Sequence, residues 1–332
     1  MKKQTGYCLL GAVCLFLGFA VTSPALLEEA AALITPYGLA AALSVLVAFA
    51  VWLLSMGSGA ENGNGMTPAP GAAAFLAFCA FLGARALYVL IRFPFYLDTG
   101  ISHIFAVREG GFLLYGAVLG AALSALLLAK EKGLPFSSVL DEITLPGLAS
   151  VFLCRLAEGF SREGLGAWVE DERFCRFPFA VQNAYGEYQW SVFLLEAAYA
   201  LLIFLFLFRR FSRTGHKDDI FLSALLFYAA AQIFFESLRS DSSLKIGFVR
   251  VSQVLSAAAI LCTVILRNRK TQRALFYKTF LFAAGCGGIG AIEWALDKTE
   301  LNAGLLYACM ILICIVLVLA AREPRSSARR EA

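Results

Sequence analysis

A dense group of charged side chains stands where a long apolar stretch of this sequence ends. The stretch covers residues 136–156, and the group contains Arg155, Glu158, Arg162 and Glu163. Charged groups at the end of a membrane span are costly unless they are paired or functional. An arginine suits a phosphate, because its planar fork donates two parallel hydrogen bonds. Neighbouring carboxylates would hold the arginine in place or handle protons, so the group indicates a phosphate-binding site.

Further ionisable side chains lie inside other apolar stretches. A helical rise of about 1.5 Å per residue places six residues at a similar depth: Arg85, Tyr115, Arg155, Glu196, Glu236 and Arg239. Two interpretations stay open, namely structural ion pairs between helices and a polar cavity that opens to the outer leaflet. A basic pocket between membrane helices is a known mode of lipid recognition. The cavity interpretation therefore predicts a phospholipid head group as the ligand.

The composition predicts that membrane-spanning helices carry these residues. The chain has 332 residues, of which 60% are hydrophobic and 16% charged, against roughly 25% charged residues in a soluble domain. Such an excess of apolar side chains must face lipid. Each long apolar run is sufficient to cross a hydrocarbon layer of about 30 Å as a helix. The sequence thus predicts an all-α, polytopic integral membrane protein with ten candidate spans, at residues 6–24, 37–56, 71–93, 110–129, 136–156, 190–208, 218–238, 249–266, 275–294 and 304–321.

Basic residues in the short loops predict the orientation of these spans. Lysines and arginines gather at the N-terminus, after the fourth, sixth and eighth spans, and in the tail. The side with this excess is the cytoplasm, so the C-terminus is expected there and the charged group after residue 154 outside. The first span has a second interpretation as a secretory signal peptide, because Lys2 and Lys3 precede an apolar run that ends near Ala25. Both interpretations leave the remaining spans in the same orientation.

Metal and cofactor chemistry has little support in the sequence. The nine cysteines include no CxxC pair, and the two histidines, His103 and His216, are far apart. Zinc sites need such ligands at short spacings. We therefore expect no metal, no cofactor and no nucleic-acid partner.

Four glycines stand at the start of the fourth span: Gly110, Gly111, Gly116 and Gly120. The last two form a small-xxx-small pair on one helix face, which is typical of close helix packing. The alternative is that the backbone here approaches a ligand. Both interpretations are kept.

At these residues the sequence resembles the prolipoprotein diacylglyceryl transferases of bacteria, over about residues 37–267. The similarity rests on an ordered series of short motifs with matching spacing. In chain order they are Tyr37–Leu39 (YGL), Leu82–Val89 (LGARALYV), Glu109–Gly120 (EGGFLLYGAVLG), Cys154–Gly166, Pro178–Ala180 (PFA), Tyr228–Arg239 and Val251–Ser256 (VSQVLS). The family has seven spans and an outward-facing polar site, which the second to eighth spans reproduce.

The resemblance implies a domain organisation and a reaction. Residues 33–268 would form the seven-helix transferase-like core. Residues 1–32 would add an N-terminal helix or signal-like segment, and residues 269–332 two further helices with a basic cytoplasmic tail. The family transfers a diacylglyceryl group from phosphatidylglycerol to the lipobox cysteine of a prolipoprotein. The implied partners are phosphatidylglycerol, a prolipoprotein signal peptide and the lipid bilayer, at the outer face of a bacterial inner membrane.

The resemblance also implies roles for individual residues. Arg155 would bind the phosphate, with Glu163 and Glu236 orienting basic groups. The implied catalytic residues are Arg155, Glu163, Tyr115 and Glu236. The implied substrate-binding residues are Tyr37, Arg85, Gly110, Gly111, Glu158, Tyr228, Gln232 and Arg239.

Three of these positions depart from the family pattern. Tyr115 stands where the family has histidine, Glu158 where it has asparagine, and Gln232 where it has the first arginine of its YxxxRxxxExxR helix. The alternative prediction is therefore a catalytically altered or inactive family member, which binds a phospholipid or a membrane partner without transfer.

Overall fold

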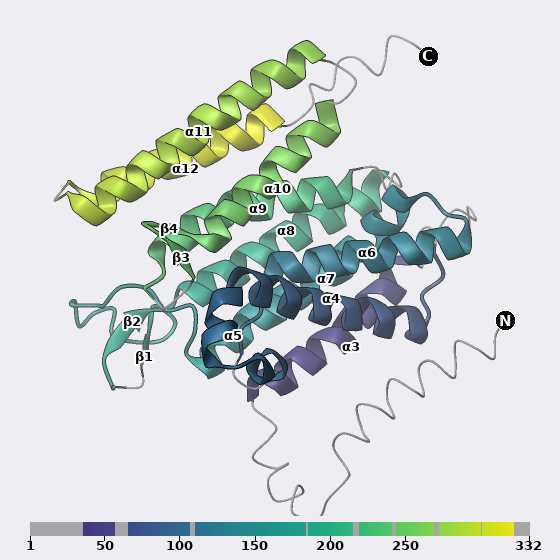
Figure 1. Ribbon diagram of the computed structural model, residues 1–332, viewed down its shortest axis with the longest axis horizontal. Helices are drawn as coiled ribbons and strands as arrows, with labels where there is room; N and C mark the ends of the chain where they lie inside the picture. Colours follow the sequence, from purple (N-terminus) through teal and green to yellow (C-terminus); the bar gives the residue numbers. More distant parts are fainter. Residues whose placement is uncertain are drawn as a thin grey trace, which may run out of the picture. The chain divides into compact units, whose positions relative to one another are not determined.

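The structure is a computed structural model, which describes residues 36–56, 66–106, 110–183, 185–214, 219–240, 244–268, 272–299 and 301–321. The first predicted span, 6–24, and the basic tail lie outside the described residues. Helices dominate the described part, as Figure 1 shows. They are α3 (Pro36–Met56), α4 (Pro70–Ile91), α5 (Phe93–Thr99), α6 (Leu114–Lys132), α7 (Phe136–Ser161), α8 (Val192–Thr214), α9 (Ile220–Leu238), α10 (Val251–Asn268), α11 (Gln272–Lys298) and α12 (Ala303–Ala321).

Eight helices of the described part are long and apolar enough to cross a membrane: α3, α4, α6, α8, α9, α10, α11 and α12. The helix α7 is longer than most of these, but it carries Asp141, Glu142, Arg155 and Glu158 and is not among the eight. Large apolar side chains stay exposed on the spanning helices, for example Leu54, Leu90 and Leu202. A lipid environment would cover them. The prediction of an all-α polytopic membrane protein is confirmed, and nine of the ten predicted spans coincide with described helices.

Short elements fill three of the connections that the sequence left as loops. Helix α5 and a 3-10 helix, η2 (Ile101–Phe105), follow α4. Strand β1 (Ala180–Gln182) pairs antiparallel with β2 (Tyr188–Trp190), and β3 (Lys245–Ile246) with β4 (Val249–Arg250). The registers are Val181 opposite Gln189 and Ile246 opposite Val249.

The chain divides into two compact units, Met1–Ser161 with Phe204–Asp219, and Arg162–Ile203 with Ile220–Ala332. In the first unit α4 packs on α6, and α3 packs on α7. Glycines allow the contact between α4 and α6. A Cβ at Gly116 would lie 2.8 Å from Leu87 Cβ and 2.9 Å from Ala84 Cα, and a Cβ at Gly120 would strike the backbone of Cys79. The packing interpretation of this glycine pair is confirmed.

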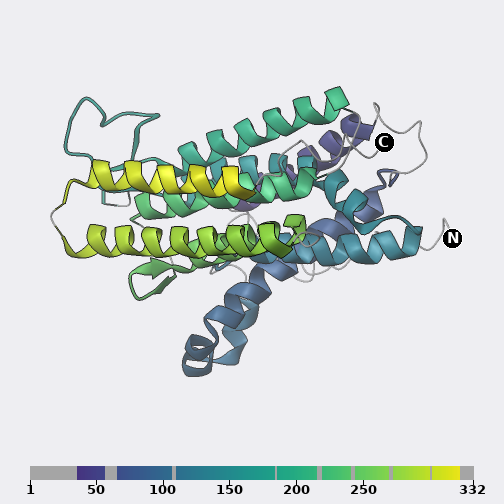
Figure 2. The ribbon, with the colours of Figure 1, turned by 90° about the horizontal axis from the view of Figure 1, so that it is seen from above.

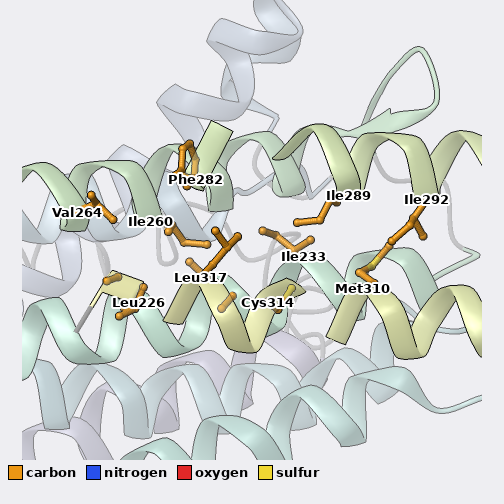
Figure 3. Packing of buried hydrophobic residues seen from close by; sticks show 13 residues of the cluster. Leu226, Ile233, Ile260, Val264, Phe282, Ile289, Ile292, Met310, Cys314 and Leu317 are labelled. Carbon is orange, nitrogen blue, oxygen red and sulfur yellow. The ribbon is translucent and has the colours of Figure 1, made fainter. Parts of the chain in front are cut away.

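In the second unit α9, α10, α11 and α12 enclose an apolar cluster. Figures 1 and 2 show α11 and α12 side by side. Leu226 and Ile233 come from α9, and side chains from the other three helices pack against them (Figure 3). The partners labelled in the figure are Ile260, Val264, Phe282, Ile289, Ile292, Met310, Cys314 and Leu317. These four helices therefore share one core.

Candidate functional site

The residues that the sequence singled out fall into both compact units. The first unit holds Tyr37, Arg85, Gly110, Gly111, Tyr115, Arg155 and Glu158. The second unit holds Glu163, Tyr228, Gln232, Glu236 and Arg239.

Arg85 lies on α4 and is only 8% exposed. Its guanidinium donates to backbone carbonyls of the segment between α5 and α6. Nε donates to Ile104, Nη1 to Gly110 and Gly111, and Nη2 to His103 and Ala106. The rings of Tyr88, Tyr96 and Phe112 lie 5.8–5.9 Å from its central carbon.

These hydrogen bonds determine what Arg85 does in this structure. A guanidinium has five N–H donors, and Arg85 makes five hydrogen bonds to carbonyl oxygens. A phosphate could bind Arg85 only in exchange for these bonds. Arg85 thus holds the loop that leads into α6. The backbone carbonyls in turn compensate the cost of burying its guanidinium.

Gly110 and Gly111 form the turn that directs two of these carbonyls at Arg85. Their φ angles are +74° and +80°, a region that favours glycine. A Cβ at Gly111 would lie 2.6 Å from Tyr88 Cε1 and 2.8 Å from Arg85 Nη1. At Gly110 a Cβ would meet nothing within 4 Å. Gly111 is therefore required both by its backbone conformation and by close approach.

Tyr115 is the second residue of α6 and is buried. The backbone N–H of Leu113 donates to the carbonyl of Ala84 at 3.1 Å. This bond joins the start of α6 to the part of α4 that carries Arg85. The structure thus brings Arg85, the glycine turn and the first turn of α6 into one neighbourhood.

Arg155 and Glu158 form an ion pair near the end of α7, with Nη1 and Oε1 2.5 Å apart. Their side chains are 11% and 12% exposed. Ser44 on α3 accepts a hydrogen bond from Ser150 through its carbonyl oxygen. This contact packs α3, whose second residue is Tyr37, against the middle of α7. Because of the ion pair, Glu158 engages at least one donor of Arg155, the arginine that the sequence assigns to phosphate.

In the second unit, Tyr228, Gln232 and Glu236 stand four residues apart on α9 and are all buried. This spacing puts them on one helix face. The Gln232 amide Nε2 donates to Glu236 Oε1 at 3.0 Å. Among the described residues, the other oxygen, Glu236 Oε2, has no hydrogen-bond partner. A buried carboxylate thus faces a neutral amide at the position where the sequence lacks an expected arginine.

Glu196 on α8 and Arg239 at the end of α9 form an ion pair, with Oε1 and Nη1 3.6 Å apart. Their side chains are 0% and 10% exposed. For these two residues the structure agrees with the interpretation that the deep charges form ion pairs between helices. The sequence marked Glu196 as unusually deep in its span, but its partner could be found only from the fold.

Glu163 is exposed and lies in the loop that follows α7. That loop is tied to the end of α9. The Ser240 N–H donates to the Leu165 carbonyl at 2.8 Å, and Gly166 pairs with Arg239. A Cβ at Gly166 would lie 2.8 Å from Val192 Cγ2 and 3.0 Å from the Leu238 carbonyl oxygen, so the two segments approach closely here. The backbone therefore places the Glu163 loop beside the segment that carries Arg239.

Sequence reasoning missed two acidic residues that the structure gives a definite contact. Glu142 is buried in α7, and its Oε2 accepts a hydrogen bond from the Met66 N–H at 2.9 Å. Glu293 on α11 accepts hydrogen bonds from Ser237 and Gln253. The signal that could have identified both residues was an acidic side chain within a predicted span.

In the part of the chain that the structure describes, no group of three or more His, Cys, Asp and Glu is placed to hold a metal ion.

The fold and these buried charges define a multi-pass membrane protein with arginine–carboxylate pairs in its helices. A sequence model of the family described as prolipoprotein diacylglyceryl transferase matches residues 24–268, and the chain belongs to this family. Its relatives include the phosphatidylglycerol–prolipoprotein diacylglyceryl transferase of Clostridium novyi (strain NT), which is 30% identical over 190 residues, 56% of this chain and 73% of that protein. The protein of the same name from Lactobacillus acidophilus is 28% identical over 206 residues, 59% of this chain and 73% of that protein.

Proposed function

We propose that this protein transfers the diacylglyceryl group of phosphatidylglycerol to the cysteine thiol of a prolipoprotein. The observation that carries the proposal is the family match, which spans residues 24–268 and therefore includes every motif residue discussed above. The relatives in Clostridium novyi and Lactobacillus acidophilus bear the name of this activity. Homology at this level supports an enzyme of the transferase class.

The reaction places two demands on the protein. The cysteine sulfur must attack a glycerol carbon as the thiolate, while the bond from that carbon to the phosphate oxygen breaks. Glycerol phosphate leaves with the electron pair, so its growing negative charge needs a cation. We assign the phosphate to Arg155, because its guanidinium is held at the end of α7 by a carboxylate on the same helix. Glu163 and Glu236 are proposed to orient basic groups, and Tyr115 is proposed as a further catalytic residue at the position where the family has histidine.

The remaining proposed site residues divide by their contacts. Arg85, Gly110 and Gly111 are joined to one another, which supports a role in shaping the segment between α5 and α6 rather than in binding phosphate. Tyr37 and Tyr228 are proposed to line the substrate region. Glu158, Gln232 and Arg239 are proposed to set the charge around the head group.

The protein is a multi-pass membrane protein of this family, and the orientation is part of the proposal. Basic loops on one side predict a cytoplasmic C-terminus and a site that faces outward. We propose residues 33–268 as the seven-helix transferase core, with the N-terminal segment and the last two helices added to it. The partners would be phosphatidylglycerol, a prolipoprotein signal peptide and the bilayer.

A second candidate function is lipid binding with altered or absent transfer. Two contacts favour it. Glu158 already pairs with Arg155 and would compete with a phosphate. Gln232 offers Glu236 a neutral amide, so the second unit has one cation fewer than the family pattern. Both positions depart from the family sequence together with Tyr115.

The deciding experiment is a transfer assay. Purified protein in lipid nanodiscs would be incubated with phosphatidylglycerol and a peptide that carries a lipobox cysteine. Mass spectrometry would look for the peptide increased by one diacylglyceryl group in thioether linkage. The Clostridium novyi relative, run in parallel, is the positive control. A product from the control and none from this protein at any enzyme level would refute transfer.

A restored variant separates the two candidate functions. It would carry Tyr115→His, Glu158→Asn and Gln232→Arg together. If the chemistry has been lost through these changes, the folded variant should gain transfer activity over the natural chain. If the natural chain is already an adapted enzyme, the variant should be equal to it or slower. Binding of phosphatidylglycerol is expected in both cases.

A further inference from the structure

The last two helices lie outside the family match but share a core with helices inside it. The match ends at residue 268, and α11 begins at Gln272. In Figure 3, Phe282 and Ile289 of α11 and Leu317 of α12 lie against Ile233 of α9 and Ile260 of α10. The additional helices therefore have a fixed place against α9, the helix that carries Tyr228, Gln232 and Glu236.

At one end of this four-helix core, a polar network joins α11 to α9 and α10. The Ser237 hydroxyl donates to Glu293 Oε1. The Gln253 amide Nε2 lies 2.5 Å from the same oxygen, 3.0 Å from Ser237 Oγ and 3.2 Å from the Ile233 carbonyl oxygen. The Tyr307 hydroxyl on α12 reaches the Ser237 carbonyl at 3.5 Å. Glu293 Oε1 thus accepts hydrogen bonds from α9 and α10, two helices of the region that the family model matches.

The opposite end of the core is joined in the same manner. Arg267 at the end of α10 donates to Ser223 Oγ on α9 at 2.9 Å. Lys278 of α11 donates to Asn268 Oδ1 at 2.8 Å. The same Arg267 lies 3.5 Å from the carbonyl oxygen of Ala321 in α12. With both ends and the middle in contact, α11 cannot shift without disturbing α9 or α10.

The network lies next to the proposed site residues. Ser237 directly follows Glu236 and stands two residues before Arg239. The Gln253 side chain accepts a hydrogen bond from the Arg250 N–H at 3.0 Å, and the Arg250 guanidinium donates to the Arg239 carbonyl. Glu293 is therefore connected to Ser237, the residue that follows Glu236, and through Gln253 and Arg250 to the carbonyl of Arg239.

We propose that Glu293 is a positioning residue, which sets the end of α9 and with it the placement of Glu236 and Arg239. The proposal rests on the transferase function proposed above. Glu293 does not touch substrate in this proposal, because it acts only through Ser237 and Gln253. A half-buried carboxylate suits this role, since its oxygen accepts from two donors at once and such charge-assisted bonds are short and strong. The segment beyond the family match thus contributes to the site.

The test compares variants of one helix in nanodiscs. Glu293→Ala removes the acceptor, and Glu293→Gln keeps an acceptor oxygen. Asp297→Asn is the matched control, because Asp297 is on the same helix, is more than half exposed and pairs with its neighbour Lys298. Displacement of reacting groups lowers turnover strongly, so we expect kcat of Glu293→Ala to fall about tenfold with KM for phosphatidylglycerol changed less than about threefold. Glu293→Gln should recover most of the rate, and the control should match the natural chain.

Hydrogen exchange supplies a readout that does not depend on transfer. Amides of residues 233–240 should exchange about tenfold faster in Glu293→Ala and not in the control. If the natural chain makes no product, the proposed function fails while the exchange data still decide the positioning role. Should Glu293→Ala not fold, Ser237→Ala removes the partner donor and is expected to lower kcat about threefold. Unchanged exchange in Glu293→Ala, or a natural rate in a folded Glu293→Ala or in Ser237→Ala, would overturn the proposal.

Discussion

Arg85 and Arg239, one in each compact unit and both largely shielded from solvent, are satisfied in different ways. Arg85 donates five hydrogen bonds to backbone carbonyls of a loop that follows its own helix. Arg239 lies 3.6 Å from the carboxylate of Glu196, which another helix supplies. The first arginine is satisfied by neutral dipoles with fixed positions, and the second by a full opposite charge on a side chain.

The difference indicates which arginine is available for chemistry. Carbonyls of a tight loop cannot withdraw without unfolding that loop, so Arg85 is committed to structure. An arginine that is paired with a carboxylate side chain can exchange this anionic partner for a phosphate, at a smaller cost in reorganisation. We therefore expect changes around Arg85 to act mainly on stability, and changes around Arg239 to act on stability less and on function more.

The largest effect is expected for Arg85→Lys. Lysine keeps the charge but has three donors, so at least two of the five carbonyls lose their partner. A buried group without a partner costs about 1–3 kcal/mol, and the contacts with three rings are also weakened. We expect a loss of about 4 kcal/mol in unfolding free energy, measured by SDS titration in mixed micelles.

Arg92→Lys is the control for this change. Arg92 stands at the end of the same helix, donates to the Tyr88 hydroxyl at 3.1 Å and lies over the Phe95 ring. Its replacement should cost about 1 kcal/mol or less. Equal losses for the two variants would show that Arg85 does not hold the loop through its five donors.

The glycine turn supplies a second, smaller test with an internal control. Gly111→Ala combines a positive φ with a clash against Tyr88 and Arg85, whereas Gly110→Ala has the positive φ alone. A non-glycine residue in this conformation costs about 1–2 kcal/mol, and a clash in a packed region adds about 1–3 kcal/mol. We expect losses of about 3 kcal/mol for Gly111→Ala and about 1.5 kcal/mol for Gly110→Ala. The same micelle titration measures both, and a larger loss at Gly110 would contradict the described contacts.

The sequence was sufficient to predict the long helices, because each apolar run is by itself long enough to indicate a membrane-spanning helix. The run at 304–321 became α12, and the run at 37–56 became α3, with ends that agree within one residue. Short elements were missed because they contain no such run. Helix α5 has seven residues and β3 has two, and both depend on tertiary contacts that no local pattern reveals.

The charged residues inside apolar spans could be identified from the sequence, but their pairings could not. A deep Glu196 and a deep Arg239 are each visible as anomalies in an apolar span, yet their partnership requires two helices to pack at one register. Arg85 is a sharper case. Its acceptors are main-chain carbonyls, which every residue possesses, so no side-chain pattern distinguishes a loop anchor from a phosphate ligand. Glu293 was overlooked because the family motifs end before α11.

The smallest effect we predict distinguishes two buried carboxylates of the second unit. Glu196→Gln removes the charge that faces Arg239, and breaking a buried pair in this way costs about 3–5 kcal/mol when the geometry is tight. Because these atoms are 3.6 Å apart, we expect about 2 kcal/mol. Glu236→Gln instead replaces a carboxylate that has an amide neighbour and one oxygen without a hydrogen-bond partner in the described part of the chain. Its unfolding free energy should change by less than about 1 kcal/mol, because removing an uncompensated buried charge offsets the lost hydrogen bond.

Transfer activity should respond in a different order from stability. Glu236→Gln is expected to lose most of its rate although it stays folded, since Glu236 is a proposed catalytic residue that orients basic groups. Glu196→Gln should lose less transfer rate than Glu236→Gln, because it affects the site only through a displacement of Arg239. Both are measured by the thioether assay beside the micelle titration. If Glu236→Gln is destabilised more than Glu196→Gln, the carboxylate of Glu236 contributes more to stability than its contacts indicate. The proposed difference between the two acids would then be wrong.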